Sequence, residues 1–311
     1  MNNLKMNQIG SSNLKVTNIG MGGAPLVITE ESNAIETLHT AYNEGIRYFD
    51  TAPYYGAGIS EKYFGKFLSS VERNSFVISS KVGRIIENQE IKFDYTREGI
   101  LRSLEESLER LNLDYIDIAL IHDPDDHYLQ ALNESFPTLA DLKSQGIIKA
   151  IGCGMNQWQM LLDFANNADF DCFLLAGRYT LLDHSAMHSF MPKCLEKNIS
   201  LILGGPYNSG ILASDFKSES TYFYEPSPTK VTEKARLIKN VCDKYEVPLK
   251  AASLQFGLNH PSVVSTIPGP SNPNELKENL KMVNITINND LWKELKDKKL
   301  IDLECPENIN S

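Results

Sequence analysis

Four side chains with complementary acid–base properties stand in the first half of the chain. Asp50 ends the short apolar run RYFD, Lys81 ends FVISSK and His122 ends IDIALIH. Tyr55 follows Asp50 by five residues, in the glycine-containing turn PYYGAG. A phenol ordinarily has a pKa near 10, and an adjacent ammonium group stabilises the phenolate and lowers that pKa. Together these groups are suited to moving one proton at a carbonyl or alcohol oxygen.

Each of these residues also has a structural explanation when it is taken alone. Asp50 can cap a turn, Lys81 can be a surface lysine with a buried stem, and Tyr55 can serve packing. In the arrangement that favours catalysis, Lys81 lowers the pKa of Tyr55, and Asp50 keeps Lys81 charged and oriented. His122 then donates a hydrogen bond to a substrate oxygen.

The segments around these residues alternate between strand and helix along the chain. After an N-terminal hairpin at 6–9 and 14–16, we expect eight strands, at 19–21, 47–50, 76–81, 115–122, 148–152, 172–175, 201–204 and 263–267. Helices are predicted at 34–44, 59–69, 96–111, 128–145, 157–166, 189–198, 231–245, 249–258, 274–283 and 291–298, and a long loop at 211–230. Short, almost continuously apolar strands are typical of parallel sheets buried on both faces. The pattern predicts an α/β fold, a (β/α)8 TIM barrel forming a single domain over 1–311 with an extra C-terminal helix.

Active sites of such barrels form at the carboxyl ends of the strands, where the four residues are predicted to lie. An open sheet that binds a dinucleotide is disfavoured, because the run GMGGAP has Pro25 where the third glycine of that fingerprint belongs. The predicted helix 96–111 shows the regularity of the pattern. Leu101, Leu104, Leu108 and Leu111 share one face, and Glu105, Glu106, Glu109 and Arg110 share the other, which we interpret as solvated.

The composition limits the possible partners and compartments. A formal net charge of −10 argues against nucleic acid or an anionic membrane as a partner. The N-terminus lacks the apolar core of a secretion signal, and no stretch approaches the roughly 20 apolar residues that span a bilayer. Five scattered cysteines without a C-x-x-C pair indicate reduced, mostly buried thiols. We therefore expect a cytoplasmic protein, as a monomer or a weak homo-oligomer.

A metal site is the competing interpretation of this region, because His122, Asp123, Asp125, Asp126 and His127 are close in sequence. Catalytic metals in barrels normally take ligands from several strand ends. The first predicted strand ends in glycines and the seventh in Gly-Gly-Pro-Tyr, so no metal is expected.

Four motifs occur in order along the chain: GIRYFDTAPYYG, SSK, LDYIDIALIHD and IPGPSNPNELKEN. With them the sequence resembles the aldo-keto reductases over practically its whole length. The resemblance implies a nicotinamide cofactor bound in extended form without a Rossmann domain, and Asp50, Tyr55, Lys81 and His122 as catalytic tetrad. The runs LLAGRYTLLDH, GGPYNSGIL and FGLNHPSVVSTIPG are similar to the branch that contains L-fucose, D-threo-aldose and L-galactose dehydrogenases, with pyridoxal 4-dehydrogenase close by.

The resemblance also suggests which cofactor is used. In NADPH-preferring relatives a basic residue follows the Ile-Pro pair and an arginine lies six positions beyond it, whereas Gly269 and Glu275 occupy these positions here. A carboxylate repels a 2′-phosphate but can accept hydrogen bonds from a ribose hydroxyl, so we predict NAD over NADP. Glu275 also fits position N3 of a capping box, with Asn272 as N-cap and Pro273 at N1. The missing basic pair favours NAD in either case.

Further cofactor contacts follow from the same resemblance. Asn156 is the candidate for the nicotinamide carboxamide, and Tyr207 for the stacking aromatic residue. The other positions are Gly22 and Asp50, then Asn208, Gly210 and Leu212 along the pyrophosphate, and Glu278 and Asn279 at the adenine end. The carboxamide ligand on strand six stays open, with Arg178 and Tyr179 nearby.

The leading hypothesis for function is oxidation of an aldose at C1. Tyr55 as phenolate would take the proton of the anomeric hydroxyl while C1 gives a hydride to NAD, which leaves a lactone. Dehydrogenation of pyridoxal, general reduction of aldehydes or ketones, and a non-catalytic barrel that reports redox state to a partner protein are the alternatives. Tyr55 and His122 would contact the small sugar or aldehyde substrate. Tyr222 and Tyr224, on either side of Phe223, are predicted to select it, with packing as the other explanation.

Overall fold

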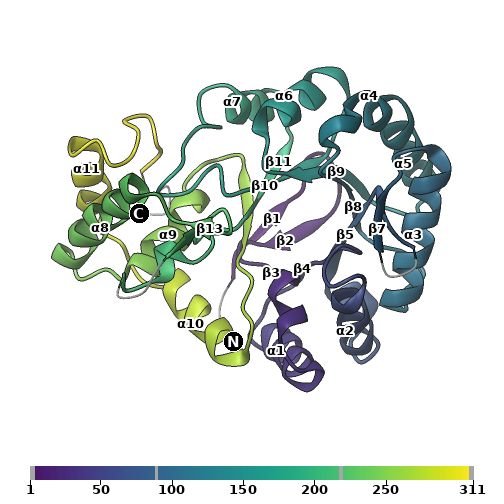
Figure 1. Cartoon of the computed structure of the whole chain (residues 1–311), viewed down its shortest axis with the longest axis horizontal. Helices are drawn as coiled ribbons and strands as arrows, with labels where there is room; N and C mark the ends of the chain where they lie inside the picture. The colour runs from purple at the N-terminus through teal and green to yellow at the C-terminus, as the bar shows by residue number, and fades with distance from the viewer. Residues whose placement is uncertain (1–3, 88–89, 217–219, 308–311) are drawn as a thin grey trace.

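The computed structural model describes residues 4–87, 90–216 and 220–307. Within these ranges eight parallel strands form one sheet, in the spatial order β3, β4, β5, β8, β9, β10, β11, β14 (Figure 1). Their bounds are β3 Met21–Gly22, β4 Tyr48–Asp50, β5 Val77–Val82, β8 Ile118–His122, β9 Ala150–Met155, β10 Cys172–Ala176, β11 Ser200–Gly204 and β14 Val263–Ile267. A bridge between Ile19 and Thr266 joins the two ends of this order. The sheet is thereby closed, and the predicted (β/α)8 barrel is confirmed.

Helices surround the sheet (Figure 1). They are α1 Glu31–Asn43, α2 Ile59–Leu68, α3 Arg97–Leu111, α4 Tyr128–Gln130, α5 Phe136–Ser144, α6 Trp158–Asn167, α7 Phe190–Glu196, α8 Thr229–Lys244, α9 Leu249–Leu258, α10 Pro273–Val283 and α11 Asn289–Asp297. A π-helical turn, Ala131–Ser135, joins α4 to α5 directly, so the helix predicted at 128–145 runs without a break from 128 to 144 and has a π-helical turn inside it. The predicted C-terminal helix is α11, which packs on α8.

The N-terminal hairpin closes one end of the barrel. Strands β1 (Met6–Gln8) and β2 (Lys15–Thr17) pair antiparallel. Ile9, Leu14 and Val16 are buried among residues of the barrel interior, and the amide of Gly10 donates a 2.8 Å hydrogen bond to the hydroxyl of Ser200, the first residue of β11. The hairpin therefore plugs the end of the barrel at which the strands begin.

Side chains of each barrel strand alternate between the interior and the helices. In β8, Ile118 and Leu120 pack in the interior, while Ala119 and Ile121 belong to the cluster formed with the helices. The same alternation places His122, two residues after Leu120, on the inward face of β8. Asp50 lies on the inward face of β4, because it follows the inward-facing Tyr48 by two residues. Acid–base residues thus converge where the strands end.

Two hairpins at the ends of barrel strands were missed in the sequence. After β5 the chain forms β6 (Arg84–Glu87) and β7 (Glu90–Phe93). The predicted loop 211–230 contains a 3₁₀ turn (Ile211–Ala213) and the hairpin of β12 (Thr221–Tyr222) and β13 (Glu225–Pro226). Both hairpins belong to the barrel mouth and contribute to the site described next.

The remaining global expectations concern membranes and thiols. No helix in the described ranges combines the length and apolar character needed to cross a bilayer. All five cysteines are buried and free, in agreement with the prediction of reduced thiols.

Candidate active site

The ammonium group of Lys81 is the centre of the site. It donates hydrogen bonds to Oδ2 of Asp50 at 2.7 Å, to the carbonyl oxygen of Thr51 at 2.9 Å and to the phenolic oxygen of Tyr55 at 2.9 Å. An ammonium group only donates, so the Tyr55 oxygen accepts in this bond. The phenolic hydrogen of Tyr55 is therefore left for another acceptor.

Asp50 is held by a second layer of hydroxyl groups. Its Oδ1 accepts a 2.7 Å hydrogen bond from Ser79, whose hydroxyl lies 3.0 Å from that of Tyr48. Tyr48 and Ser79 precede Asp50 and Lys81 by two residues on the same inward faces. Sequence reasoning missed them, although period-2 counting backward from Asp50 and Lys81 would have found both.

Burial sets the charges of the site. The side chains of Asp50 and Lys81 are each 2% exposed. Burial opposes the charge on Lys81, yet Asp50 and Tyr55 together hold the pKa of Lys81 above its usual value. Burial also raises the pKa of Tyr55, and the lowering effect of Lys81 does not outweigh it. Lys81 thus lowers the pKa of Tyr55, as predicted, but the net shift is upward because burial has the larger effect, and Tyr55 is a neutral phenol at pH 7.

His122 completes the group at the end of β8. Its ring is perpendicular to that of Tyr55, with centroids 6.2 Å apart. Burial, followed by the nearby charges of Lys81 and Arg84, lowers the pKa of His122 well below its usual value. The imidazole is neutral at pH 7 and retains one N–H donor.

A buried ion pair fixes the helix that follows Tyr55. Glu61 in the first turn of α2 is fully buried, and its carboxylate accepts 2.6 Å hydrogen bonds from Ser80, next to Lys81, and from Nε of Arg110 on α3. The interpretation of Arg110 as part of a purely solvated face is therefore wrong. Arg110 also packs against Gly58, where a Cβ would lie 2.7 Å from Cδ of Arg110 and where φ is +84°. The pair thus braces the turn that carries Tyr55 against β5.

Glu61→Leu is expected to lower the free energy of unfolding by roughly 3 kcal/mol, because it leaves Arg110 without its buried counterion. Urea unfolding measures this change through the midpoint. Glu31→Gln is the matched control, because Glu31 of α1 makes an exposed ion pair with Lys66 of α2. This substitution should change the free energy of unfolding by no more than about 1 kcal/mol. Equal effects of the two substitutions would contradict a structural role for the buried pair.

A cavity of about 430 Å³ opens beside Tyr55. Five residues predicted to contact a cofactor line it, namely Gly22, Asp50, Tyr207, Gly210 and Gly269. The lining also includes Gly204 and Gly205 at the end of β11 and Thr221 and Tyr224 of the β12–β13 hairpin. Side chains are small along most of this wall, which exposes backbone groups to a ligand.

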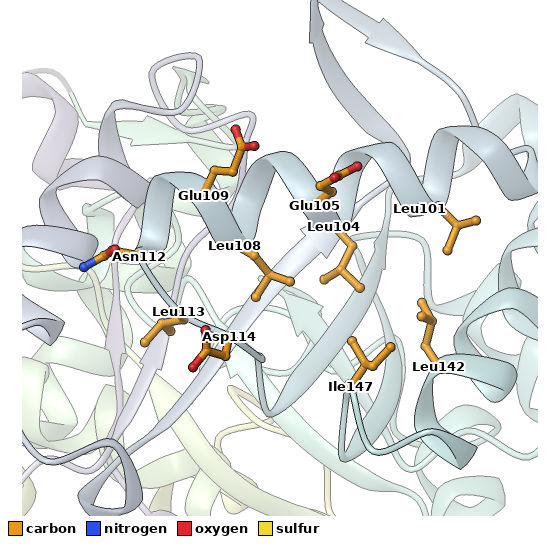
Figure 2. Close-up of a pocket in the computed structure, with 10 residues that line it drawn as sticks. All are labelled: Leu101, Leu104, Glu105, Leu108, Glu109, Asn112, Leu113, Asp114, Leu142 and Ile147. Atoms are coloured by element: carbon orange, nitrogen blue, oxygen red, sulfur yellow. The ribbon is translucent and has the colours of Figure 1, made fainter.

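A second hollow lies outside the barrel and lacks all four acid–base residues. Figure 2 shows leucines of α3 facing Leu142 of α5 and Ile147, with Glu105 and Glu109 on the same helix. This hollow has no acid–base pair like that of Tyr55 and Lys81, so the cavity beside Tyr55 is the candidate active site.

Comparison with known protein families identifies the family to which this chain belongs. The profile of the Aldo/keto reductase family matches residues 18–299. The chain belongs to the aldo/keto reductase family.

Two relatives and one solved structure show how far this likeness extends. D-threo-aldose 1-dehydrogenase of a Pseudomonas species is 36% identical, over 87% of this chain and 89% of the relative. Pyridoxal 4-dehydrogenase of Microbacterium luteolum is 33% identical, over 94% of this chain and 97% of the relative. The aldo-keto reductase AKR11C1 from Bacillus halodurans, in its holo form, superposes with a TM-score of 0.81 at 24% identity over 96% of both chains, which concerns the fold alone. The protein is an oxidoreductase enzyme of the branch that the sequence motifs indicated.

Aldo/keto reductases generally use NAD(P)(H), and the cavity suits such a cofactor. Its volume lies in the range of about 300–1,000 Å³ that is usual for small-molecule sites. Open space next to Gly205 and Gly210 allows a ligand to approach the backbone. Among the described residues no group of His, Cys, Asp and Glu is arranged to hold a metal ion.

The other residues expected to contact the cofactor of this aldo/keto reductase differ in how many of their polar groups already have hydrogen-bond partners within the protein. Tyr207 donates a 2.7 Å hydrogen bond to Oδ1 of buried Asn279, so the two side chains act together. The Asn156 amide donates to the carbonyl oxygen of Ala176, a cavity residue, at 2.8 Å. Asn208 is buried and donates to the carbonyl oxygen of Gly177. Leu212 is fully buried and its N–H donates to the carbonyl oxygen of Tyr207, which leaves it no free N–H for a pyrophosphate.

The adenine end of the predicted site carries two glutamates. Glu275 accepts hydrogen bonds from the amide and hydroxyl of Ser271, at 2.8 and 2.9 Å, while Asn272 caps α10. Asn272 is thus the N-cap, as predicted, but Glu275 bonds Ser271, the residue before the N-cap, and not the Asn272 amide that a capping box would use. Glu278 pairs with Lys250 at 2.7 Å.

The remaining candidates for contacting the cofactor or the substrate are Arg178, Tyr179, Tyr222 and Tyr224. Arg178 pairs with Asp183 and lies over the ring of Phe223, and Tyr179 is buried against Phe256, so neither is a lining residue of the cavity. Tyr222 packs edge-on against Phe223, in line with the packing explanation. Tyr224 lines the cavity and is 89% exposed.

Proposed function

We propose that this aldo/keto reductase oxidises an aldose at C1 to the lactone with NAD. The hydrogen-bonded chain from Asp50 through Lys81 to Tyr55, beside a cavity of cofactor size, supports this reaction most strongly. The likeness to a D-threo-aldose 1-dehydrogenase over 89% of that enzyme supports the substrate class.

In this proposal Tyr55 is the group that carries the proton. The C1 hydroxyl gives its proton to the Tyr55 oxygen, the C1–H bond breaks as hydride departs, and a C1=O bond forms. Nicotinamide supplies the hydride acceptor when it is bound. Lys81 stabilises the phenolate through its 2.9 Å hydrogen bond, and neutral His122 donates to the oxygen on C1.

Asp50 has a supporting role in the same proposal. It lies 2.7 Å from the ammonium group and keeps it charged, which is why Lys81 can act on Tyr55 although both are buried. The hydroxyl of Ser79 fixes the carboxylate in turn. Reduction of an aldehyde would use the same groups in reverse, with the neutral phenol as proton donor.

The preference for NAD is proposed from Gly269 and Glu275. A Cβ at Gly269 would lie 2.7 Å from ring carbons of Pro25, so a basic side chain there would have to displace this proline. One oxygen of Glu275 is engaged by Ser271, and the other is available to a ribose hydroxyl. The nearby Lys250 is neutralised by Glu278.

A substrate panel tests the proposal. L-Fucose, L-galactose, D-arabinose and pyridoxal are each incubated with NAD or NADP, and absorbance of the reduced cofactor is followed. We expect turnover of at least one aldose, with kcat/KM at least about 10-fold higher for NAD than for NADP. Glu275→Gln keeps an acceptor for Ser271 and should narrow that ratio by raising activity with NADP. Absence of any aldose oxidation would refute the substrate class, and a preference for NADP would refute the cofactor assignment.

Pyridoxal is the second candidate substrate. The relative named pyridoxal 4-dehydrogenase spans nearly all of both chains at 33% identity. Pyridoxal also forms a cyclic hemiacetal, so the same proton and hydride transfers apply to it. Turnover of pyridoxal without turnover of any aldose would favour this candidate.

A further inference from the structure

We propose that Arg84 and Asp123 form a subsite that binds hydroxyl groups of the substrate next to the reacting carbon. This subsite rests on the proposed function, because it names how the same active site would recognise a sugar rather than a plain aldehyde.

The pair adjoins two members of the catalytic group. Asp123 directly follows His122, and its Oδ2 lies 3.6 Å from Nε2 of that histidine. Arg84, the first residue of β6, donates a 2.7 Å hydrogen bond from Nη2 to the same carboxylate oxygen. Its guanidinium lies 4.5 Å from the ring centroid of Tyr54, which precedes Tyr55 and meets His122 edge-on at 5.9 Å. The charges therefore lie beside the position at which His122 and Tyr55 would hold a substrate oxygen.

Several contacts fix the pair in place. The guanidinium of Arg84 lies close to the rings of both Tyr54 and Phe93, at 4.5 and 5.2 Å, and the side chain is 11% exposed. The hydroxyl of Tyr95 donates to the carbonyl oxygens of His122 and Asp123, at 2.6 and 2.9 Å. Asp123 itself has a φ of +40°, in the left-handed region that aspartate adopts more readily than most residues.

The pair has bonding capacity that the protein does not use. A guanidinium carries five N–H groups, and among the described residues the side chain of Arg84 interacts through hydrogen bonds with Asp123 and with the hydroxyl of Tyr95, which leaves further N–H groups for a ligand. Its Nε is buried and has no partner there. The carboxylate of Asp123 is 24% exposed, and no other described residue donates a hydrogen bond to it.

A fixed donor beside a fixed acceptor matches neighbouring hydroxyl groups of a sugar. Each hydroxyl can donate to Asp123 and accept from Arg84, and hydrogen bonds to charged groups are stronger than those between neutral groups. An aldehyde without hydroxyl groups gains nothing from the pair. The pair should therefore raise activity toward polyhydroxylated substrates selectively.

The test compares two reductions by NADH, of D-erythrose and of 4-nitrobenzaldehyde, and adds oxidation of L-fucose by NAD. Arg84→Met keeps the length of the side chain and removes its charge. We expect it to lower kcat/KM for D-erythrose and L-fucose by about 10- to 100-fold, mainly through KM. Reduction of 4-nitrobenzaldehyde should change by less than about threefold. Asp123→Asn should show the same selectivity with a smaller loss.

Arg97→Met is the matched control, because Arg97 of α3 makes an exposed ion pair with Asp141 of α5 and should affect neither substrate. Equal losses for D-erythrose and 4-nitrobenzaldehyde in Arg84→Met, or no loss for either, would overturn the subsite. If the wild-type enzyme reduces D-erythrose but oxidises no aldose, the proposed oxidation is refuted. The loss of D-erythrose reduction in Arg84→Met then still decides whether Arg84 and Asp123 bind substrate hydroxyl groups. Failure of the wild-type enzyme to use any hydroxylated aldehyde would overturn both.

Discussion

Tyr55→Phe is expected to lower kcat by roughly 1,000-fold, because it removes the group that exchanges the proton with the substrate oxygen. The phenyl ring keeps the packing of Tyr55, and only the oxygen bound by Lys81 is lost. Affinity for NAD should stay within about twofold, since the proton-carrying oxygen contributes to chemistry more than to binding. Steady-state rates and a fluorescence titration with the cofactor measure the two effects separately.

Tyr63→Phe is the matched control for this substitution. Tyr63 lies on α2, outside the barrel, and lines a surface hollow between α2 and α3. It should leave kcat unchanged. Retention of more than about a tenth of wild-type kcat in Tyr55→Phe would remove Tyr55 from the mechanism.

Lys81→Met should lower kcat by at least about 100-fold and also destabilise the protein. The substitution removes the charge that stabilises the Tyr55 phenolate, and it leaves the carboxylate of Asp50 buried without its ion pair. Breaking one partner of a buried pair costs about 3–5 kcal/mol. Rates are measured at saturating substrate, and stability by urea unfolding.

The double variant Asp50→Asn with Lys81→Met separates the two losses. It removes the unpaired charge, so most of the lost stability should return, whereas kcat should stay low because no ammonium contacts Tyr55. Recovery of activity together with stability would contradict a direct action of Lys81 on the phenol.

The barrel and the grouping of Asp50, Tyr55, Lys81 and His122 were accessible from sequence because each depends on short-range pattern. The inward register of Asp50, Lys81 and His122 follows from alternation within three short strands, and the helices follow from their apolar periodicity. The sequence predicted the lowering effect of Lys81 on the pKa of Tyr55, but it does not reveal how completely the phenol is buried, and burial outweighs that effect.

Other features depend on partners far apart in the chain. Arg110 has the pattern of a solvated residue, yet its partner Glu61 lies 49 positions earlier on another helix. The spacing of residues along α3 does not indicate that Arg110 pairs with a residue of α2. Asp123 and Arg84, 39 positions apart, were missed for the same reason.

The β12–β13 hairpin illustrates a different limit. Its two turn residues, Phe223 and Tyr224, both have positive φ, at 50° and 65°. Two-residue hairpins of this kind normally use Asn and Gly at these positions. The sequence therefore carried no turn signal, and the segment was predicted as loop.

The most direct test of the account is the pH dependence of hydride transfer in single-turnover oxidation of L-fucose by NAD. Burial raises the pKa of Tyr55, so the phenolate that accepts the proton is a minor species whose fraction grows about tenfold per pH unit. We predict that the rate rises continuously from pH 6 to 9 without a plateau, and that Tyr55→Phe loses this rise. A rate that is independent of pH, or one that levels off through a group titrating near 6.5, would contradict proton transfer by Tyr55.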